Sequence, residues 1–199
     1  MYGIKWYKEL DSTNNEVKRE LDFLDNFAVI ATESQSAGRG QGSHSWFASP
    51  GLNLTFSILY RPSSLPASQA IVLTHITTVA LLHYLSAHGV QARVKWPNDI
   101  WVGEKKICGI LIETVLNKAL VKDSIIGIGL NLGEKNWPED LPNPVSLSEL
   151  TGKEYDPKAE LELFMEHFIK CATLSESEEG RQILKEAFEA TLFRRPEEP

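Results

Sequence analysis

The feature that most constrains the fold is the series of short apolar runs between residues 93 and 130. Breakers such as Pro97 and Gly103 separate these runs at short spacing. A series of strands interrupted so closely predicts antiparallel pairing. The expected strands cover residues 93–96, 100–102, 106–116 and 121–130.

Other segments add strands and helices to this core. Leu54, Phe56, Ile58 and Tyr60 are apolar residues at every second position, which predicts a half-buried strand over 53–60. Further strands are expected at 4–10 and 27–32, and helices at 13–21, 68–88, 146–150, 157–174 and 178–193. Together they predict an α+β fold, in which helices pack on one face of a mixed, mainly antiparallel sheet.

The first helix begins at a polar cluster. Ser12 or Thr13 can accept a hydrogen bond from the first free N–H groups, and Glu16 lies three residues after Thr13. This spacing predicts a capping box. A capping hydroxyl that also faces a cleft could bind a polar ligand group.

Composition excludes several classes of protein. With 199 residues the chain is long enough for one domain, and its net charge of −7 weighs against a nucleic-acid binder. No N-terminal apolar leader follows Met1, and no apolar run is long enough to span a bilayer. Cys108 and Cys171 lie far apart and lack metal-ligand spacing. A reduced, cytoplasmic protein that binds neither DNA nor membranes is expected.

A glycine-rich loop occupies residues 36–46, between two expected strands. It carries Gly38, Arg39, Gly40 and Gly42 within five positions. Exposed N–H groups beside an arginine can hold an anion. No Gly-Lys-Ser/Thr closes the loop and no helix pattern opens after it, so it is neither a Walker loop nor a dinucleotide fingerprint. Taken alone, such a stretch is more often a flexible surface loop than a binding site.

Four further motifs change this interpretation. They are Asp11-Ser12-Thr13-Asn14, Lys95-Trp96-Pro97-Asn98-Asp99-Ile100, the run Lys105–Glu113, and Gly127-Ile128-Gly129-Leu130-Asn131. With the glycine loop, and in this order, they resemble the biotin protein ligase family over residues 8 to 195. The resemblance implies that family's catalytic domain, whose fold is similar to class II aminoacyl-tRNA synthetases. It assigns residues 1–195 to the domain and 196–199 to a tail.

The resemblance also implies an activity. Such enzymes join biotin to ATP, release pyrophosphate, hold biotinyl-5′-adenylate, and pass the biotin to a lysine of a biotin carboxyl carrier domain. Two anions must meet in the first step, so cations must neutralise their approach. The resemblance implies catalytic roles for Lys106, Arg39 and Lys95, and Asp99 is expected to contact Mg²⁺. We expect Lys95 and Lys106 to lie on adjacent strands aimed at one spot.

Two sets of binding residues are implied in the same way. Biotin's ureido group needs paired donors and acceptors, because a buried unpaired amide costs roughly 1–3 kcal/mol. The expected biotin-binding residues are Ser12, Thr13, Asn14, Gln35, Gly38, Arg39, Gly40, Lys106, Gly109, Gly127 and Gly129. The expected nucleotide-binding residues are Gln41, His44, Trp46, Lys95, Asn98 and Asn131.

The chain departs from the family pattern in three places. Gln41 and His44 stand where the loop usually carries basic residues, and Ser43 where a glycine is common. No DNA-binding helix-turn-helix precedes Tyr2, so a repressor role is not expected. Near Leu192 the family usually enters a small C-terminal β-barrel, and here the chain stops at Pro199. We expect the glycine loop to close over the adenylate once both ligands are bound.

Three alternatives remain open from the sequence. A lipoate ligase shares the fold and the adenylate chemistry. A biotin-binding or regulatory protein without turnover would fit the missing barrel, although Lys95, Asp99 and Lys106 argue for catalysis. Some relatives pair their sheets edge to edge, so a homodimer is also an alternative.

Overall fold

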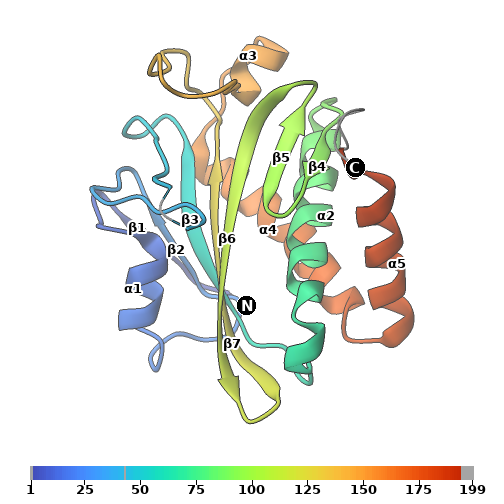
Figure 1. The fold of residues 1–199 in the computed structure, drawn as a ribbon. Coiled ribbons are helices and arrows are strands. Elements are labelled where there is room, and N and C mark those ends of the chain that lie inside the picture. The colour runs from blue at the N-terminus through green and yellow to red at the C-terminus, as the bar shows by residue number, and fades with distance from the viewer. Residues whose placement is uncertain (1, 43, 194–199) are drawn as a thin grey trace.

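A computed structural model describes residues 2–42 and 44–193, so Ser43 and the expected tail 196–199 lie outside the described residues. These residues form a seven-stranded sheet in the order β1-β2-β3-β7-β6-β5-β4 (Figure 1). The strands are β1 Ile4–Tyr7, β2 Val29–Thr32, β3 Leu54–Tyr60, β4 Arg93–Lys95, β5 Asp99–Val102, β6 Lys105–Asn117 and β7 Leu120–Leu130. Only β1 and β2 pair in parallel among these strands, which confirms the mixed, mainly antiparallel sheet.

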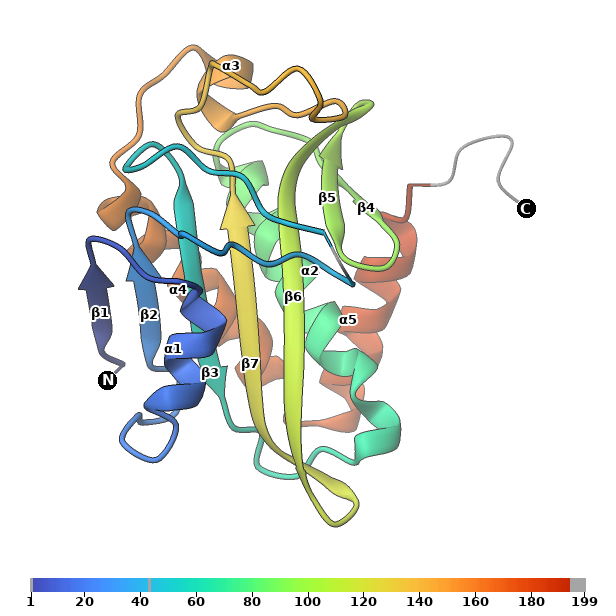
Figure 2. The ribbon, with the colours of Figure 1, turned by 60° about the vertical axis from the view of Figure 1, so that its left-hand side comes forward.

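The three long helices cover one face of this sheet. The helices are α1 Thr13–Arg19, α2 Ile71–Ala87, α3 Leu147–Thr151, α4 Pro157–Leu174 and α5 Glu178–Ala190, with a 3₁₀ turn η1 at Ala67–Gln69. Figure 2 shows α2, α4 and α5 behind the sheet, and α1 in front of it. The prediction of helices on one face therefore holds for the long helices, and α1 is the exception.

Alternating side chains explain why α1 can pack on the opposite face. Successive residues of a strand point to opposite faces. Phe56 and Ile58 join the large core beneath α2 and α4, whereas Ile30 and Leu59 join a smaller core with Val17 of α1. The front face is thus only partly covered by α1, and the rest of it is left for the site.

Helix α2 is the most apolar of the three long helices. The stretch Ala67–Ala87 is long and apolar enough to cross a membrane by length and composition, but 61% of its apolar 18-residue window is buried inside the protein. It packs between the sheet, α4 and α5, so its composition is explained by the core.

The segment that follows α5 pairs with the edge strand β4. Val94 N–H donates to Thr191 O at 2.9 Å, and Phe193 N–H donates to Val94 O at 2.7 Å. The Phe193 ring also stacks on Trp101, with centroids 6.1 Å apart. The last helix was predicted to run to Phe193, but it ends at Ala190 because the next residues pair with β4.

Candidate active site

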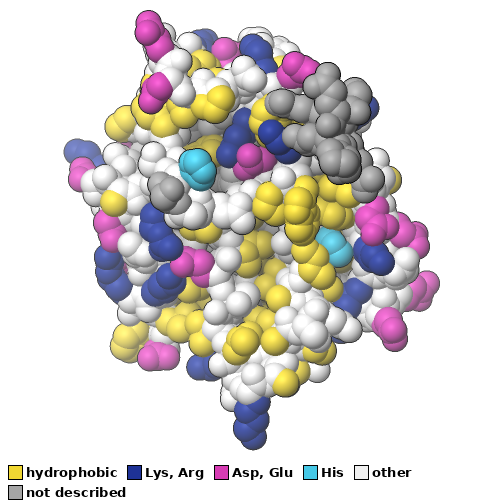
Figure 3. Space-filling model, in the orientation of Figure 1, with side chains coloured by type: hydrophobic (Ala, Val, Ile, Leu, Met, Phe, Trp, Pro, Cys, Tyr) yellow, Lys and Arg dark blue, Asp and Glu magenta, His cyan; other side chains and the backbone are white. Residues whose placement is uncertain are grey.

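The front face carries a cavity of about 240 Å³ between α1, the strands β6 and β7, and the glycine loop. Figure 2 shows this loop, which joins β2 to β3, crossing in front of β7 and β6. In Figure 3, Lys or Arg side chains lie next to an Asp or Glu side chain in the upper middle of this face. The cavity therefore has walls supplied by segments far apart in the sequence.

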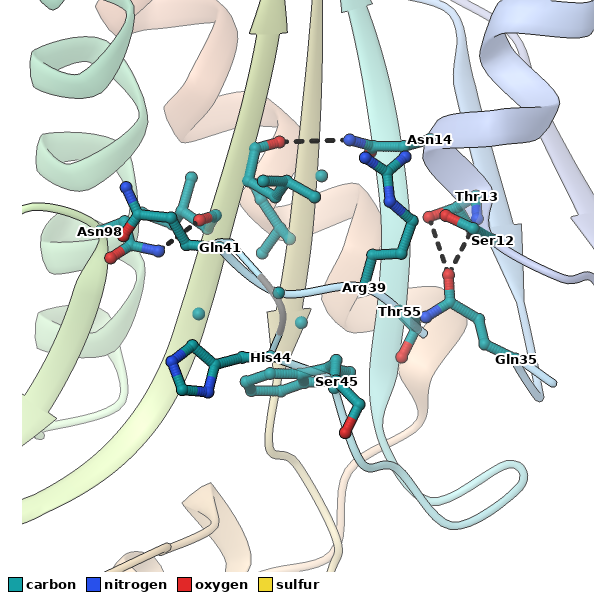
Figure 4. A pocket seen from close by; sticks show the side chains of 18 of the residues that line it. Ser12, Thr13, Asn14, Gln35, Arg39, Gln41, His44, Ser45, Thr55 and Asn98 are labelled. Carbon is teal, nitrogen blue, oxygen red and sulfur yellow. Dashed lines mark hydrogen bonds between the residues drawn. The ribbon is translucent and has the colours of Figure 1, made fainter. Parts of the chain in front are cut away.

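The α1 end of the cavity is lined mainly by uncharged polar groups, with Arg39 as the one charged side chain among its described lining residues. Gln35 Oε1 accepts hydrogen bonds from Thr13 N at 2.8 Å and Thr13 Oγ1 at 3.3 Å (Figure 4). Ser57 Oγ lies 2.7 Å from Thr13 Oγ1 and 2.6 Å from Asn14 Oδ1. A chain of hydrogen-bonding groups thus lines this end, buried at the start of α1.

The predicted capping box is wrong. Ser12 occupies the N-cap position, but its side chain makes no capping hydrogen bond, and Glu16 bonds Arg19 instead. Gln35 satisfies the Thr13 N–H, so neither hydroxyl is needed to cap the helix, and both Ser12 and Thr13 line the cavity. Sequence alone could not show that a residue from the next loop would supply this bond.

The other end of the cavity is charged. Lys106 Nζ lies 2.8 Å from Asp99 Oδ1, and the two side chains are 31% and 22% exposed. Asn98 Nδ2 donates to Ile110 O at 2.9 Å, which fixes its side chain beside this pair. A flexible cation and a carboxylate therefore face the same space from the neighbouring strands β6 and β5.

Lys95 is not part of this pair. It lies on β4, and β5 separates that strand from β6, so the prediction that adjacent strands carry Lys95 and Lys106 is wrong. Its Nζ lies 4.4 Å from the centre of the Trp101 ring, and Lys95 does not line the cavity. The turn at Pro97 suggests that Lys95 and Lys106 lie close together, but it does not reveal that β5 lies between their strands.

Two protein side chains fill the space beside the glycines of β6 and β7. A Cβ on Gly129 would lie 2.2 Å from Trp46 Cε2, and one on Gly127 would lie 2.3 Å from Asn14 Oδ1. A Cβ on Gly109 would meet the same indole at 2.8 Å. All three glycines, which were expected at the biotin site, line the cavity, and the side chains of Trp46 and Asn14 occupy the space beside them.

The glycine loop is folded as a small hairpin. Gly40 N–H donates to His44 O at 2.7 Å, and Trp46 N–H donates to Gly38 O at 3.0 Å. Gly38 does not line the cavity, and a Cβ there would lie 2.5 Å from Trp46 O. A glycine is required at position 38 because the two arms of the hairpin approach each other closely there.

The matching family model is described as the biotin/lipoate A/B protein ligase family and covers residues 6–131. The chain belongs to this family. Its relatives include the bifunctional ligase/repressor BirA of Bacillus spizizenii, 30% identical over 83% of this chain and 51% of that protein. The biotin–[acetyl-CoA-carboxylase] ligase of Paracoccus denitrificans is 33% identical over 80% of this chain and 69% of that protein. The chain thus spans about half the length of the BirA relative.

The solved structure of the Aquifex aeolicus biotin protein ligase with biotin and ATP has the same fold. Its TM-score is 0.82 at 26% identity, and the match covers 96% of this chain and 78% of that chain. The expected fold class, that of the biotin protein ligase catalytic domain, is therefore confirmed.

Most of the predicted site residues of this family member meet at one cavity. All of them line it except Gly38, Lys95 and Asn131. Asn131 Nδ2 instead donates to Lys106 O at 3.3 Å and Val145 O at 3.0 Å, so it supports the backbone of the strand that carries Lys106. The cavity is also lined by residues to which the sequence analysis gave no binding role, namely Ser45, Thr55, Ile110, Leu111 and Ile128. Strand alternation would have placed Thr55 on the same face as Gly129, its partner in β7.

A preformed metal cluster is absent from the described part of the chain. No group of three or more His, Cys, Asp or Glu side chains there could hold an ion. Asp99 contributes a single carboxylate to the cavity wall, next to Asn98. One carboxylate suits Mg²⁺ that arrives with phosphate oxygens, since Mg²⁺ is usually bound by few protein ligands plus substrate.

Proposed function

We propose that this domain activates biotin with ATP and transfers the biotinyl group to a lysine of a biotin carboxyl carrier domain. The observation that carries the proposal is one cavity with two chemically distinct ends. Neutral hydrogen-bonding groups gather around Thr13 and Gln35, and the Lys106–Asp99 pair lies at the other end. Biotin has the same polarity, with a neutral ureido ring at one end and a carboxylate at the other.

The first step joins two anions. A carboxylate oxygen of biotin attacks the α-phosphorus of ATP, the bond to the β-phosphate oxygen breaks, and pyrophosphate leaves. Lys106 can neutralise the approach and the charge on the phosphorus because its ammonium group faces the cavity. We infer that Asp99 would hold Mg²⁺ with the phosphate oxygens, which requires Lys106 to exchange its carboxylate partner for the substrates.

The second step needs an amine and a protected intermediate. The uncharged amine of the acceptor lysine attacks the biotinyl carbonyl, AMP leaves, and an amide forms. The glycine loop lies over the cavity and would shield the mixed anhydride from water. The cavity of about 240 Å³ is small against the ~300–1,000 Å³ of typical ligand pockets. The glycine loop and Trp46 must therefore shift before biotin and ATP can both fit into the cavity.

Biotin is favoured over lipoate by the polar end of the cavity. The dithiolane ring of lipoate has no N–H or C=O groups to pair with Ser12, Thr13 and Gln35, so these groups would be desolvated at a cost. The names of the relatives agree with biotin. Both cysteines are unpaired and buried, in keeping with the proposed reducing, cytoplasmic location.

The test is biotin-dependent exchange of labelled pyrophosphate into ATP. Removing a positioned charge of this kind costs about 10²–10³-fold in rate, so Lys106→Met is expected to lose exchange to that extent. Lys105→Met is the matched control, because Lys105 is the exposed neighbour and does not line the cavity. Equal rates in the two variants would refute the role of Lys106.

A second measurement separates the alternatives. Thermal unfolding with biotin or lipoate shows which ligand the domain binds. Stabilisation by biotin without any exchange would contradict the ligase proposal and favour a biotin-binding protein. Stabilisation by lipoate alone would favour a lipoate ligase.

A further inference from the structure

The role of Arg39 follows from what its guanidinium contacts. Arg39 Nη2 lies 3.0 Å from Glu113 Oε1, and Arg39 Nη1 donates to Asn15 Oδ1 at 3.0 Å. Figure 4 shows the side chain directed toward Asn14, away from His44 and Asn98. The guanidinium is therefore bonded at the α1 side of the cavity, and Lys106 pairs with Asp99 at the opposite end.

Glu113 joins three parts of the molecule. It lies on β6, and its carboxylate also accepts from Asn14 Nδ2 at 2.8 Å and Lys18 Nζ at 2.7 Å, both on α1. Glu113, Asn14, Lys18 and Arg39 are here called the Glu113 cluster. Through this cluster one carboxylate links the sheet, the first helix and the glycine loop.

Electrostatics keep this carboxylate charged. Burial alone raises the pKa of Glu113, but the bonds from Lys18, Asn14 and Arg39 outweigh burial and hold that pKa below its ordinary value. At neutral pH the cluster contains one anion and two cations, so charge-assisted hydrogen bonds act on the loop.

The cluster also reaches the floor of the cavity. Asn14 Oδ1 fills the space beside Gly127 and lies 2.6 Å from Ser57 Oγ, and the other end of the same amide bonds Glu113. Any change in Glu113 therefore affects both the loop above the cavity and the amide beneath it. Both of these lie at the α1 end of the cavity, near Thr13 and Gln35.

We propose that Glu113 is a positioning residue, whose carboxylate holds Arg39, and with it the glycine loop, over the biotin end of the cavity while it orients Asn14. The proposal rests on the proposed function for its substrate. It assigns Arg39 to loop closure, in place of the catalytic role expected from the resemblance.

The central experiment compares Glu113→Gln with Glu20→Gln. Glu20 is a well-matched control because its side chain is 21% exposed against 23% for Glu113 and pairs with a lysine from β1, but it has no contact with the loop. Glu113→Gln is expected to raise the KM for biotin about tenfold in pyrophosphate exchange, and to change the KM for ATP less than about twofold. Glu20→Gln is expected to leave both constants unchanged.

A second measurement needs no substrate. Hydrogen exchange of the Gly40 and Trp46 amides, which close the loop hairpin, reports how firmly the loop is held. We expect faster exchange in Glu113→Gln and in Arg39→Met, and little further increase in the double variant, because both changes break the same contact. Arg39→Lys should restore part of the protection, since a lysine can keep the ion pair but not the bond to Asn15.

The outcomes distinguish the two proposals. Loop amides that exchange equally in wild type, Glu113→Gln and Glu20→Gln would overturn the positioning role, whatever the enzyme activity. A lower KM for ATP in Glu113→Gln would also overturn it, because that result would show that Glu113 withholds Arg39 from the phosphates. Faster loop exchange in a protein without pyrophosphate exchange would support the positioning role and count against the ligase function.

Discussion

Gly129 is the residue on which the position of Trp46 depends. Its missing Cβ leaves space for the indole, and Gly129→Ala would place a methyl group 2.2 Å from Trp46 Cε2. Overpacking of this kind costs about 1–3 kcal/mol, so we expect a loss of stability by that amount and displacement of the indole. Denaturant unfolding and tryptophan emission measure the two effects.

The cause can be isolated with two further variants. Gly3→Ala is the control, because nothing lies within 4 Å of a Cβ at Gly3. If the clash with the indole is the cause, Gly129→Ala should cost much less stability in a Trp46→Ala background. An unchanged cost in that background would show that the backbone of β7, and not Trp46, requires the glycine.

At the same scale, residue types were predictable from the sequence and contacts were not. Ser12, Gln35 and Lys106 were all predicted from the sequence as site residues, and all three line one cavity. They did not reveal that Arg39 would bond a carboxylate 74 residues away, nor that Trp46 would cover Gly129. Such pairings are set by sheet register and loop closure, which local sequence does not encode.

Among the elements, the segment between the glycine loop and β3 is anchored by one buried acid. Glu134 is 1% exposed, and its carboxylate accepts from Ser49 N, Asn53 Nδ2, Lys135 N and Asn136 N. It thereby ties the segment that follows Trp46 to the chain that leaves β7. Glu134→Gln would turn an acceptor into a donor facing these donors, and we expect a loss of about 1–3 kcal/mol at pH 7.

The pH dependence of stability tests the same anchor. Burial raises the pKa of Glu134, but the hydrogen bonds from Ser49, Asn136 and Asn53 outweigh it and lower that pKa in the folded state. A lowered folded pKa stabilises the protein above the ordinary value of 4.5, and this stability is lost as the pH falls through the folded pKa. The free energy of unfolding of Glu134→Gln should therefore fall less than that of wild type between pH 6 and 3.5.

The control for this experiment is a second acid in the segment between β7 and α3, which also contains Glu134. Glu139→Gln, at an exposed position, is expected to follow the wild-type pH profile. A Glu134→Gln profile parallel to wild type would mean that the carboxylate contributes nothing that depends on its charge.

Whole elements were predictable where their signal is local. The alternation in 53–60 and the breakers within 93–130 placed the strands to within a few residues. The order of the strands and the position of α1 on the opposite face depend on long-range packing. They emerged only from the structure, and so did the end of α5.

At the scale of the whole molecule, the sheet is protected at its β4 edge by the chain itself. Exposed strand edges present unpaired N–H and C=O groups and promote association between molecules. Here Thr191 and Phe193 pair with Val94, so a segment that follows the last described helix covers the edge of a strand almost 100 residues earlier. The contact also places the Phe193 ring on Trp101.

Phe193→Pro tests whether the backbone contact or the ring is responsible for this protection. Proline removes the N–H that donates to Val94 O, so we expect the edge to open and the apparent mass to rise with concentration relative to wild type. Phe193→Ala keeps the N–H but loses the stacked ring, so it should lower the melting temperature without increasing association. Light scattering across a concentration series measures the first effect, and thermal unfolding the second. Association of both variants to the same extent would assign the protection to the aromatic contact, because only the ring is missing from both.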